Sequence, residues 1–467
     1  METLVPPPWR RAWLALVVIM AAALALRVMM AQGGLWLDEA WSALFAREAE
    51  TPLGVFLSIH HDNNHHLNSL WMQAVGIDAA PAVQRALSIA AGTLSVGVAA
   101  AIGLRRDLPT AIAAALLFAL SPILVTYGAE ARGYAPMALA ILVGVLIVDS
   151  WSDSDRPPPR LALALCFAVA VLAQLTALFA LVTIGGWVTI EHMRRMPARH
   201  AVRQGFDMML PSICVVLAMF LLVFLSPRLT GETMSVGAYI HFTWSAYWQA
   251  LSGLVSHLIT QPAYKSAWPV LLALASLAAA FMLRLRRRDF YALAILIFPI
   301  GMALVQPANP GNSRYYLIAA LALLLLWADL FASAWRQGGG TRVAGVAALG
   351  GFALSSLVVD RALIADARGN PDGAVRLMAS IAPGGGTLLV ERKMGRAVHE
   401  VTARRLRYPI NIVLNGCAPA DFLVVNRFRV EPFGDHRRYC GQQWRPLAQN
   451  RSEGMAEESW RLYRRID

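Results

Sequence analysis

Two adjacent acids, Asp38 and Glu39, are the first candidates for a chemical role in this chain. Neighbouring residues on a helix point about 100° apart, so these two carboxylates cannot flank one bond as a paired acid and base. One of them would act on a substrate while the other supports the site. The alternative is a solvated acidic pair at the start of a helix, where negative charge interacts favourably with the helix dipole.

The segment HHDNNHHLN (60–68) is rich in histidine. His61 and His65 are spaced i, i+4 and could bind a metal from one face of a helix. The two asparagines between them disfavour a helix, and no third ligand has a fixed spacing. Hydrogen bonds from His65 and Asn68 to a polar substrate, or a purely structural loop, are therefore favoured over metal binding.

Three further segments contain a cationic residue, and in two of them it lies beside aromatic residues. The candidate substrate-binding residues in these segments are Glu130, Arg132 and Tyr134 in YGAEARGYAP (127–136), Arg314 in SRYY (313–316), and Lys265 in the loop 227–266. The planar guanidinium of arginine suits phosphate because it binds bidentately. The alternatives are a polar turn with interfacial tyrosines, and an arginine that extends from the end of its helix to the membrane surface.

Membrane helices are the elements that must position these segments. Hydrophobic residues make up 57% of the 467 residues and charged residues 15%, whereas soluble proteins have about 45–50% and about 25%. A membrane-spanning helix needs about 20 mostly apolar residues. The sequence predicts about 11 such helices (range 10–13), at roughly 13–32, 82–104, 109–127, 133–149, 161–174, 176–191, 207–226, 267–283, 290–305, 315–334 and 343–359. The stretch 161–191 could instead be one kinked helix.

The net charge of +12 comes almost entirely from arginine. Most arginines of the membrane region fall in one alternate set of loops, which predicts that those loops and the N-terminus are cytoplasmic. The charge therefore indicates topology, and no nucleic-acid partner is expected. Because the number of spans is odd, the polar tail is expected on the outer face.

The chain therefore divides into a membrane domain, 1–359, and a small extracytoplasmic domain, 360–467. TLLVE (387–391) and FLVVN (422–426) predict strands and HEVTARRL (399–406) predicts a helix, so the tail is expected to be α/β. Cys417 and Cys440 are candidates for a disulfide in an oxidising compartment. The first outer loop, about 32–81, contains two amphipathic apolar patterns that predict helices along the membrane surface.

Four motifs in order resemble the glycosyltransferase-C superfamily, in the branch of protein O-mannosyltransferase-like and lipid A aminoarabinose-transferase-like proteins (glycosyltransferase family 39-type). They are LWLDEAWSALFA (35–46), HDNNHHLNSLW (61–71), SPILVTYGAEARGYAP (121–136) and SRYYL (313–317). The second lacks the two prolines usual in that branch, which leaves the roles of 60–68 open. The resemblance covers roughly 10–335.

The resemblance implies an inverting transfer of a sugar from a polyprenyl-phosphate donor to an acceptor hydroxyl on the outer face of a bacterial inner membrane. Asp38 would be the general base and Glu39 its support. Glu130 would orient the acceptor, or hold a divalent cation if one binds; no other cofactor is implied. Arg132, Arg314 and Lys265 would bind the lipid phosphate beside Tyr134, and His65 and Asn68 would contact acceptor or sugar. Lipid, glycan and protein acceptors all stay open.

Two other functions remain as alternatives. A transporter would place polar groups near the bilayer midplane, commonly with inverted repeats, but the spans are nearly free of acids and show no clear repeat. A polysaccharide polymerase or lipid ligase would also use lipid-linked sugars, but typically depends on a large late outer loop, whereas the paired acids here lie in the first one.

Overall fold

The structure is a computed structural model that describes residues 8–59, 65–229, 241–414, 417–428, 431–452 and 458–466. The chain forms two compact units. Unit 1 comprises the described residues of Met1–Arg27, His60–Leu67 and Leu87–Asp360. Unit 2 comprises the described residues of Val28–Ile59, Asn68–Ala86 and Arg361–Asp467. His61, a metal candidate, lies outside the described residues.

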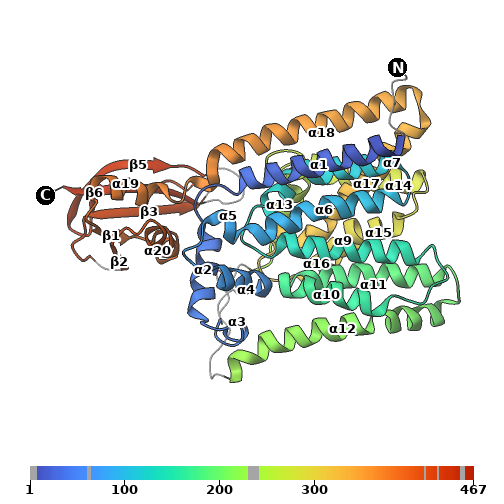
Figure 1. Ribbon diagram of the computed structural model, residues 1–467, viewed down its shortest axis with the longest axis horizontal. Helices are drawn as coiled ribbons and strands as arrows, with labels where there is room; N and C mark the ends of the chain where they lie inside the picture. Colours follow the sequence, from blue (N-terminus) through green and yellow to red (C-terminus); the bar gives the residue numbers. More distant parts are fainter. Residues whose placement is uncertain are drawn as a thin grey trace, which may run out of the picture. The chain divides into compact units, whose positions relative to one another are not determined.

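Unit 1 is built from apolar helices (Figure 1). Within the described residues, seven helical segments are long and apolar enough to cross a membrane. They are α1 (Pro8–Met30), α6 (Ala86–Leu104), α9 (Tyr134–Trp151), α12 (Ala198–Leu229), α15–η1–α16 (Arg288–Ala292, Leu293–Ile297, Phe298–Val305), η2–α17 (Ser313–Tyr316, Leu317–Gln337) and α18 (Gly339–Asp366). Four shorter apolar helices are α7 (Leu108–Leu120), α10 (Arg160–Ala173), α11 (Ala177–Met193) and α14 (Trp268–Met282). These elements fall on the eleven apolar runs of the sequence, which confirms the polytopic helical fold.

Helices α10 and α11 are two separate spans. Ala173, at the end of α10, lies beside Gly133, at the start of α9, because His65 Nδ1 is 3.3 Å from the Ala173 carbonyl and 3.2 Å from the Gly133 nitrogen. At the other end of α9, Trp151 stacks on His192 near the end of α11, with ring centroids 4.9 Å apart. Helices α10 and α11 therefore run in opposite directions, and the alternative of one kinked helix is excluded.

Two helices lie in unit 1 where the sequence analysis expected loop or a continuous span. The loop 227–266 contains α13 (Trp244–His257), whose first turn is capped by the Thr243 hydroxyl. A short helix, α8 (Pro122–Tyr127), follows α7 after a break at Ser121, where Pro122 begins the new helix. Proline suits the first turn of a helix because that position needs no amide hydrogen.

The loop arginines predicted to face the cytoplasm meet at one end of unit 1. Asp149, which is fully buried, accepts hydrogen bonds from Arg105 Nε at 2.8 Å and Arg106 at 2.9 Å, and Arg287 Nε lies 3.5 Å away. Other acid–arginine pairs at this end join Arg194 to Asp289 and Arg336 to Asp107. These pairs tie the ends of at least five helices together, so the arginines also have a structural role.

Unit 2 contains a six-stranded mixed sheet with strand order β2-β1-β3-β6-β5-β4. The strands are β1 (Gly386–Val390), β2 (Ile410–Leu414), β3 (Phe422–Phe428), β4 (Arg438–Tyr439), β5 (Gln442–Asn450) and β6 (Glu458–Ile466). Strand β1 pairs in parallel with β2 and β3, and the remaining pairs are antiparallel. Helix α20 (Arg396–Arg405) connects β1 to β2, and α19 (Gly373–Ile381) precedes the sheet. The predicted α/β tail is confirmed.

Both faces of the sheet are buried because its apolar residues alternate between them. Leu388, Val424 and Leu462 contribute to the core that contains α19 residues such as Met378. Their sequence neighbours belong to a second core on the opposite face, which includes Leu389, Leu423, Val425, Trp444 and Tyr463.

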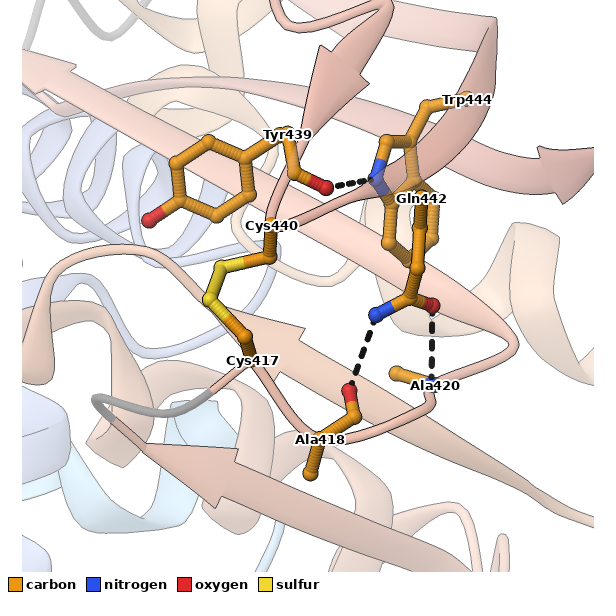
Figure 2. The surroundings of a disulfide bond; sticks show 7 residues. All are labelled: Cys417, Ala418, Ala420, Tyr439, Cys440, Gln442 and Trp444. Atoms are coloured by element: carbon orange, nitrogen blue, oxygen red, sulfur yellow. Dashed lines mark hydrogen bonds between the residues drawn. A yellow bond between two sulfur atoms is a disulfide. The ribbon is translucent and has the colours of Figure 1, made fainter.

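Cys417 and Cys440 form a disulfide, as predicted (Figure 2). Gln442 holds the segment after Cys417, because its side chain donates to the Ala418 carbonyl at 3.1 Å and accepts from the Ala420 amide at 3.4 Å. Disulfides persist in oxidising compartments.

Most of the first outer loop, the parts before residue 60 and after residue 67, folds with the C-terminal segment in unit 2, although the sequence analysis grouped the loop with residues 1–359. Its helices are α2 (Leu37–Glu48), α3 (Gly54–Leu57), α4 (His66–Val75) and α5 (Pro81–Gln84). The two predicted amphipathic helices correspond to α2 and α4. Trp41 Nε1 donates to the Met394 carbonyl at 3.0 Å, which joins α2 to the C-terminal segment.

Candidate active site

One group of candidate residues lies at the turn between α8 and α9, at the end of unit 1 opposite the arginine pairs. Glu130, Arg132 and Tyr134 are all buried, with exposed fractions of 2%, 8% and 1%. Ser88, on α6, donates its hydroxyl hydrogen to the Arg132 carbonyl at 2.9 Å and so holds the turn in place. The turn is therefore more than an exposed connection, because burying an acid and a cation is costly and usually functional in a membrane protein.

His65 packs against this turn. Its ring lies edge-on to Tyr134, with centroids 4.9 Å apart. Its Nδ1 lies between the Gly133 amide and the Ala173 carbonyl and bonds to one or the other according to its tautomer. A Cβ on Gly133 would stand only 1.6 Å from the Ala173 oxygen. Glycine is thus required at 133 by the close approach of two backbones.

Two guanidinium groups act on His65. Burial lowers the pKa of His65 well below its usual value, and the charges of Arg132 and Arg314 lower it further. The imidazole is therefore neutral at physiological pH. Its Nε2 is buried and makes no hydrogen bond to any residue that the structure describes. A neutral ring can offer this nitrogen to a hydroxyl group.

Arg314 belongs to the same group of side chains. Its guanidinium carbon lies 6.0 Å from the centre of the Tyr134 ring. The 3-10 helix η2 carries it and is anchored by Ser313, whose hydroxyl donates to the Ala250 carbonyl at 3.0 Å. The structure therefore brings His65, Arg132, Tyr134 and Arg314 together, and we call them the arginine–histidine cluster. The buried acid Glu130 lies on the same turn as Arg132.

Two other candidates lie differently. Lys265 is exposed, and its neighbour Tyr264 is the residue that packs beside Gly253 and Ser313. Asn68, in unit 2, is fully buried and its amide donates to Met72 Sδ at 3.2 Å within α4. Among the described residues, no three histidine, cysteine, aspartate or glutamate side chains form a group that could hold a metal ion.

In unit 2, Glu39 is held by an arginine that the sequence analysis did not single out. Arg85 binds both carboxylate oxygens of Glu39, at 2.9 and 2.6 Å, and neither side chain is exposed. The same guanidinium donates to the carbonyls of Ala31 and Gly34, each at 2.7 Å. Glu39 also accepts the Trp36 amide at 3.2 Å and so caps α2. This pair fixes the chain that leads into α2.

Asp38, the residue before Glu39 on α2, is half-buried. Glu458, in the C-terminal segment of the same unit, is buried. Burial raises the pKa of Glu458 to about 8, and the negative charge of Asp38 adds to this rise. Glu458 accepts a hydrogen bond from Asn426 Nδ2 at 3.0 Å. No sequence signal could have found Glu458, because about 420 residues separate it from Asp38.

Comparison with known proteins places the fold. No protein-family model matches the chain, and no curated protein sequence matches it. A solved structure, ArnT from Cupriavidus metallidurans in the apo state, superposes with a TM-score of 0.60 over 97% of this chain and 98% of that chain. The chain has the ArnT fold. Sequence identity is 14%, so the likeness concerns architecture. The superposition confirms the predicted architecture of a polytopic helical membrane protein with a small C-terminal α/β domain.

Proposed function

We propose that the protein is a membrane glycosyltransferase that moves a sugar from a polyprenyl-phosphate donor to an acceptor hydroxyl, with inversion. The observation that carries the proposal is the buried Glu39–Arg85 pair. A carboxylate bound on both oxygens by a buried guanidinium is committed to structure. The pair therefore supports Asp38, of the two adjacent acids, as the proposed catalytic residue.

The chemistry needs one base and several fixed positive charges. A phosphate ester donor already carries a good leaving group, so little acid catalysis is required. The acceptor hydroxyl must lose its proton as the new bond forms, and we assign this step to Asp38. The developing phosphate charge is stabilised by preorganised cations. Arg132 and Arg314 of the arginine–histidine cluster are proposed for this role, and Lys265 for contact with the carrier.

The remaining candidates have positioning roles in this proposal. Glu130 would orient the acceptor or hold a divalent cation. The neutral His65 and the buried Asn68 would hydrogen-bond sugar or acceptor hydroxyl groups. Tyr134 lies between His65 and Arg314 in the cluster and would present its ring to the sugar. The acceptor is a hydroxyl of a lipid, a glycan or a protein.

We propose an orientation with the N-terminus in the cytoplasm of a bacterium and unit 2 on the outer face of the inner membrane. The arginine pairs around Asp149 support it, because cytoplasmic loops are enriched in arginine. The Cys417–Cys440 disulfide supports it independently, because an oxidising compartment lies on the outer side.

The direct test is Asp38→Asn, measured as sugar transfer in membranes. The variant should insert and fold, since the amide has the same shape, and transfer should fall by a factor of at least about 10² because a general base contributes about that much. Glu48→Gln is the matched control, since Glu48 is exposed at the end of the same helix. Full activity of Asp38→Asn would refute the assignment of the base.

A second test identifies donor and acceptor together. Glycolipids and glycans from cells with and without the gene are compared by mass spectrometry. Loss of one sugar from one lipid, glycan or protein supports transfer and names its acceptor. Shortened polymers would favour a polymerase or ligase, and unchanged glycans with altered uptake would favour a transporter.

A further inference from the structure

A buried cation of unit 1, Arg27, lies outside both the acid–arginine pairs and the arginine–histidine cluster. It stands in the last turn of α1 and is 1% exposed. A charge inside a membrane protein is costly and is usually functional. Its guanidinium donates to the Phe118 carbonyl at 3.1 Å and to the Ala119 carbonyl at 3.4 Å. A third bond, to the Ala23 carbonyl at 3.1 Å, fixes the side chain against its own helix. Arg27 therefore joins α1 to the last turn of α7.

The carbonyls that Arg27 binds lie at a break between two helices. In a continuous helix the Phe118 carbonyl would accept the amide hydrogen of residue 122, but Pro122 has none. Pro122 instead begins the short helix α8. The guanidinium supplies donors at this junction, so Arg27 stabilises the start of α8.

Arg27 also contacts the residue that follows α8. A Cβ on Gly128 would stand 2.6 Å from Arg27 Nε, and a Cβ on Gly92 of α6 would stand 2.8 Å from the same atom. The Cβ on Gly92 would also stand 3.0 Å from the Gly128 Cα, so α6 and the turn approach each other closely. The side chain of Arg27 thus passes between two glycines and contacts both ends of α8.

The turn that begins at Gly128 carries Arg132 and Tyr134 of the arginine–histidine cluster. Arg27, Tyr127 and Tyr134 line one cavity of about 10 Å³, and the two tyrosine rings lie 4.7 Å apart. A cavity of this size is close to the smallest that holds a water molecule. The turn therefore has little room to shift while Arg27 is in place.

We infer that Arg27 is a positioning residue for the arginine–histidine cluster: by holding both ends of α8, it sets the place of the turn that carries Arg132 and Tyr134. The inference rests on the proposed function, in which this cluster binds the lipid phosphate. Both terminal nitrogens of Arg27 donate to main-chain carbonyls. Arg27 consequently acts through the turn and not on the phosphate itself.

The test measures the binding of farnesyl phosphate, a short isoprenyl phosphate, to the full-length protein in detergent micelles by isothermal titration calorimetry. Arg27→Met should raise the Kd by at least about tenfold, because phosphate binding by guanidinium groups depends on their geometry. The matched control is Arg105→Met, which removes the same charge and a hydrogen bond to a last-turn carbonyl, that of Asp149 in α9. Because Arg105 lies at the other end of the unit, its loss should change the Kd by less than about twofold.

Gly128→Ala separates positioning from charge, because it keeps every arginine. The added methyl group would meet Arg27 Nε at 2.6 Å, so this variant should raise the Kd by about fivefold. In the Arg27→Met background that obstacle is gone, and the same substitution should change the Kd by less than about twofold, which is the non-additivity expected of residues in contact. A wild-type Kd for Arg27→Met, or additive effects of the two substitutions, would overturn the inference.

Folding of each variant is judged by size-exclusion chromatography. If Arg27→Met does not fold, Gly128→Ala decides alone, and a wild-type Kd for it would overturn the inference. If the wild type itself binds no farnesyl phosphate, the cluster is not the carrier site, and that part of the proposed function fails together with the inference. The two failures are therefore distinguishable.

Discussion

Gly133→Ala tests the backbone junction that places His65 in the arginine–histidine cluster. The added Cβ would stand 1.6 Å from the Ala173 oxygen, 2.6 Å from the Ala173 carbonyl carbon and 3.0 Å from His65 Nδ1. Carbon atoms pack at about 3.5–4.0 Å, so the start of α9 and the end of α10 must separate by roughly 1.5 Å or more. The obstacle is backbone, which cannot rotate away as a side chain can.

The expected cost follows from that displacement. Overpacking costs about 1–3 kcal/mol, and we expect the upper end, about 3 kcal/mol, because a neighbouring main chain must move. A misplacement of about 1 Å can lower catalysis by about 10²-fold. Gly133→Ala should therefore lower both the thermal midpoint of the purified protein and sugar transfer, the latter by about two orders of magnitude.

The matched control is Gly144→Ala on the same helix. Its Cβ would meet only Ile184 Cδ1 at 3.7 Å, an ordinary contact, and alanine is favoured over glycine in a helix by about 0.5–1 kcal/mol. This variant should be as stable as the wild type or more so. If Gly133→Ala melts like Gly144→Ala and transfers sugar at the wild-type rate, the close approach of α9 and α10 is wrong.

Two other perturbations act on unit 2. Glu39→Gln or Arg85→Met should destabilise the protein by about 3–5 kcal/mol because each leaves a buried charge without its partner. The double variant Glu39→Leu/Arg85→Met should recover part of that loss in thermal melts. Thermal midpoints equal to wild type for both single variants would contradict the buried pair. Replacing Cys417 and Cys440 by serine should cost about 3 kcal/mol for the 23-residue separation. Maleimide labelling of both cysteines in unreduced, freshly isolated membranes would refute the disulfide.

The membrane helices could be predicted because hydrocarbon leaves the backbone few choices. Every amide and carbonyl in lipid must bond within its own helix or within a closed barrel, so runs of about 20 apolar residues predict spans directly. All eleven predicted runs correspond to helical segments. In the stretch 161–191, the sequence left open only whether one kinked helix or two helices form. The outcome depends on the three residues between α10 and α11.

The grouping of the candidate residues could be predicted only in part. Arg132, Tyr134 and Arg314 were found because arginine beside aromatic residues at a span end is a local pattern, and the structure groups them with His65. Lys265 was chosen because a lysine can bind phosphate, but its side chain is exposed. Its neighbour Tyr264 packs beside Gly253 instead. Residue type and position along the chain do not report which side of a turn faces the protein.

The sequence by itself determined that this is a polytopic helical membrane protein with an α/β tail, where its cations would gather, and which two acids could act. Only the tertiary structure showed that one of those acids, Glu39, is bound by a buried arginine, because Arg85 reaches it from the segment before the next span. It alone joined α2 to the C-terminal segment, through the hydrogen bond from Trp41 to the Met394 carbonyl, which links residues 353 positions apart. Local sequence patterns predict which face of a helix is apolar and which loops are charged. The partner of a buried charge instead depends on which distant segments of the chain fold together.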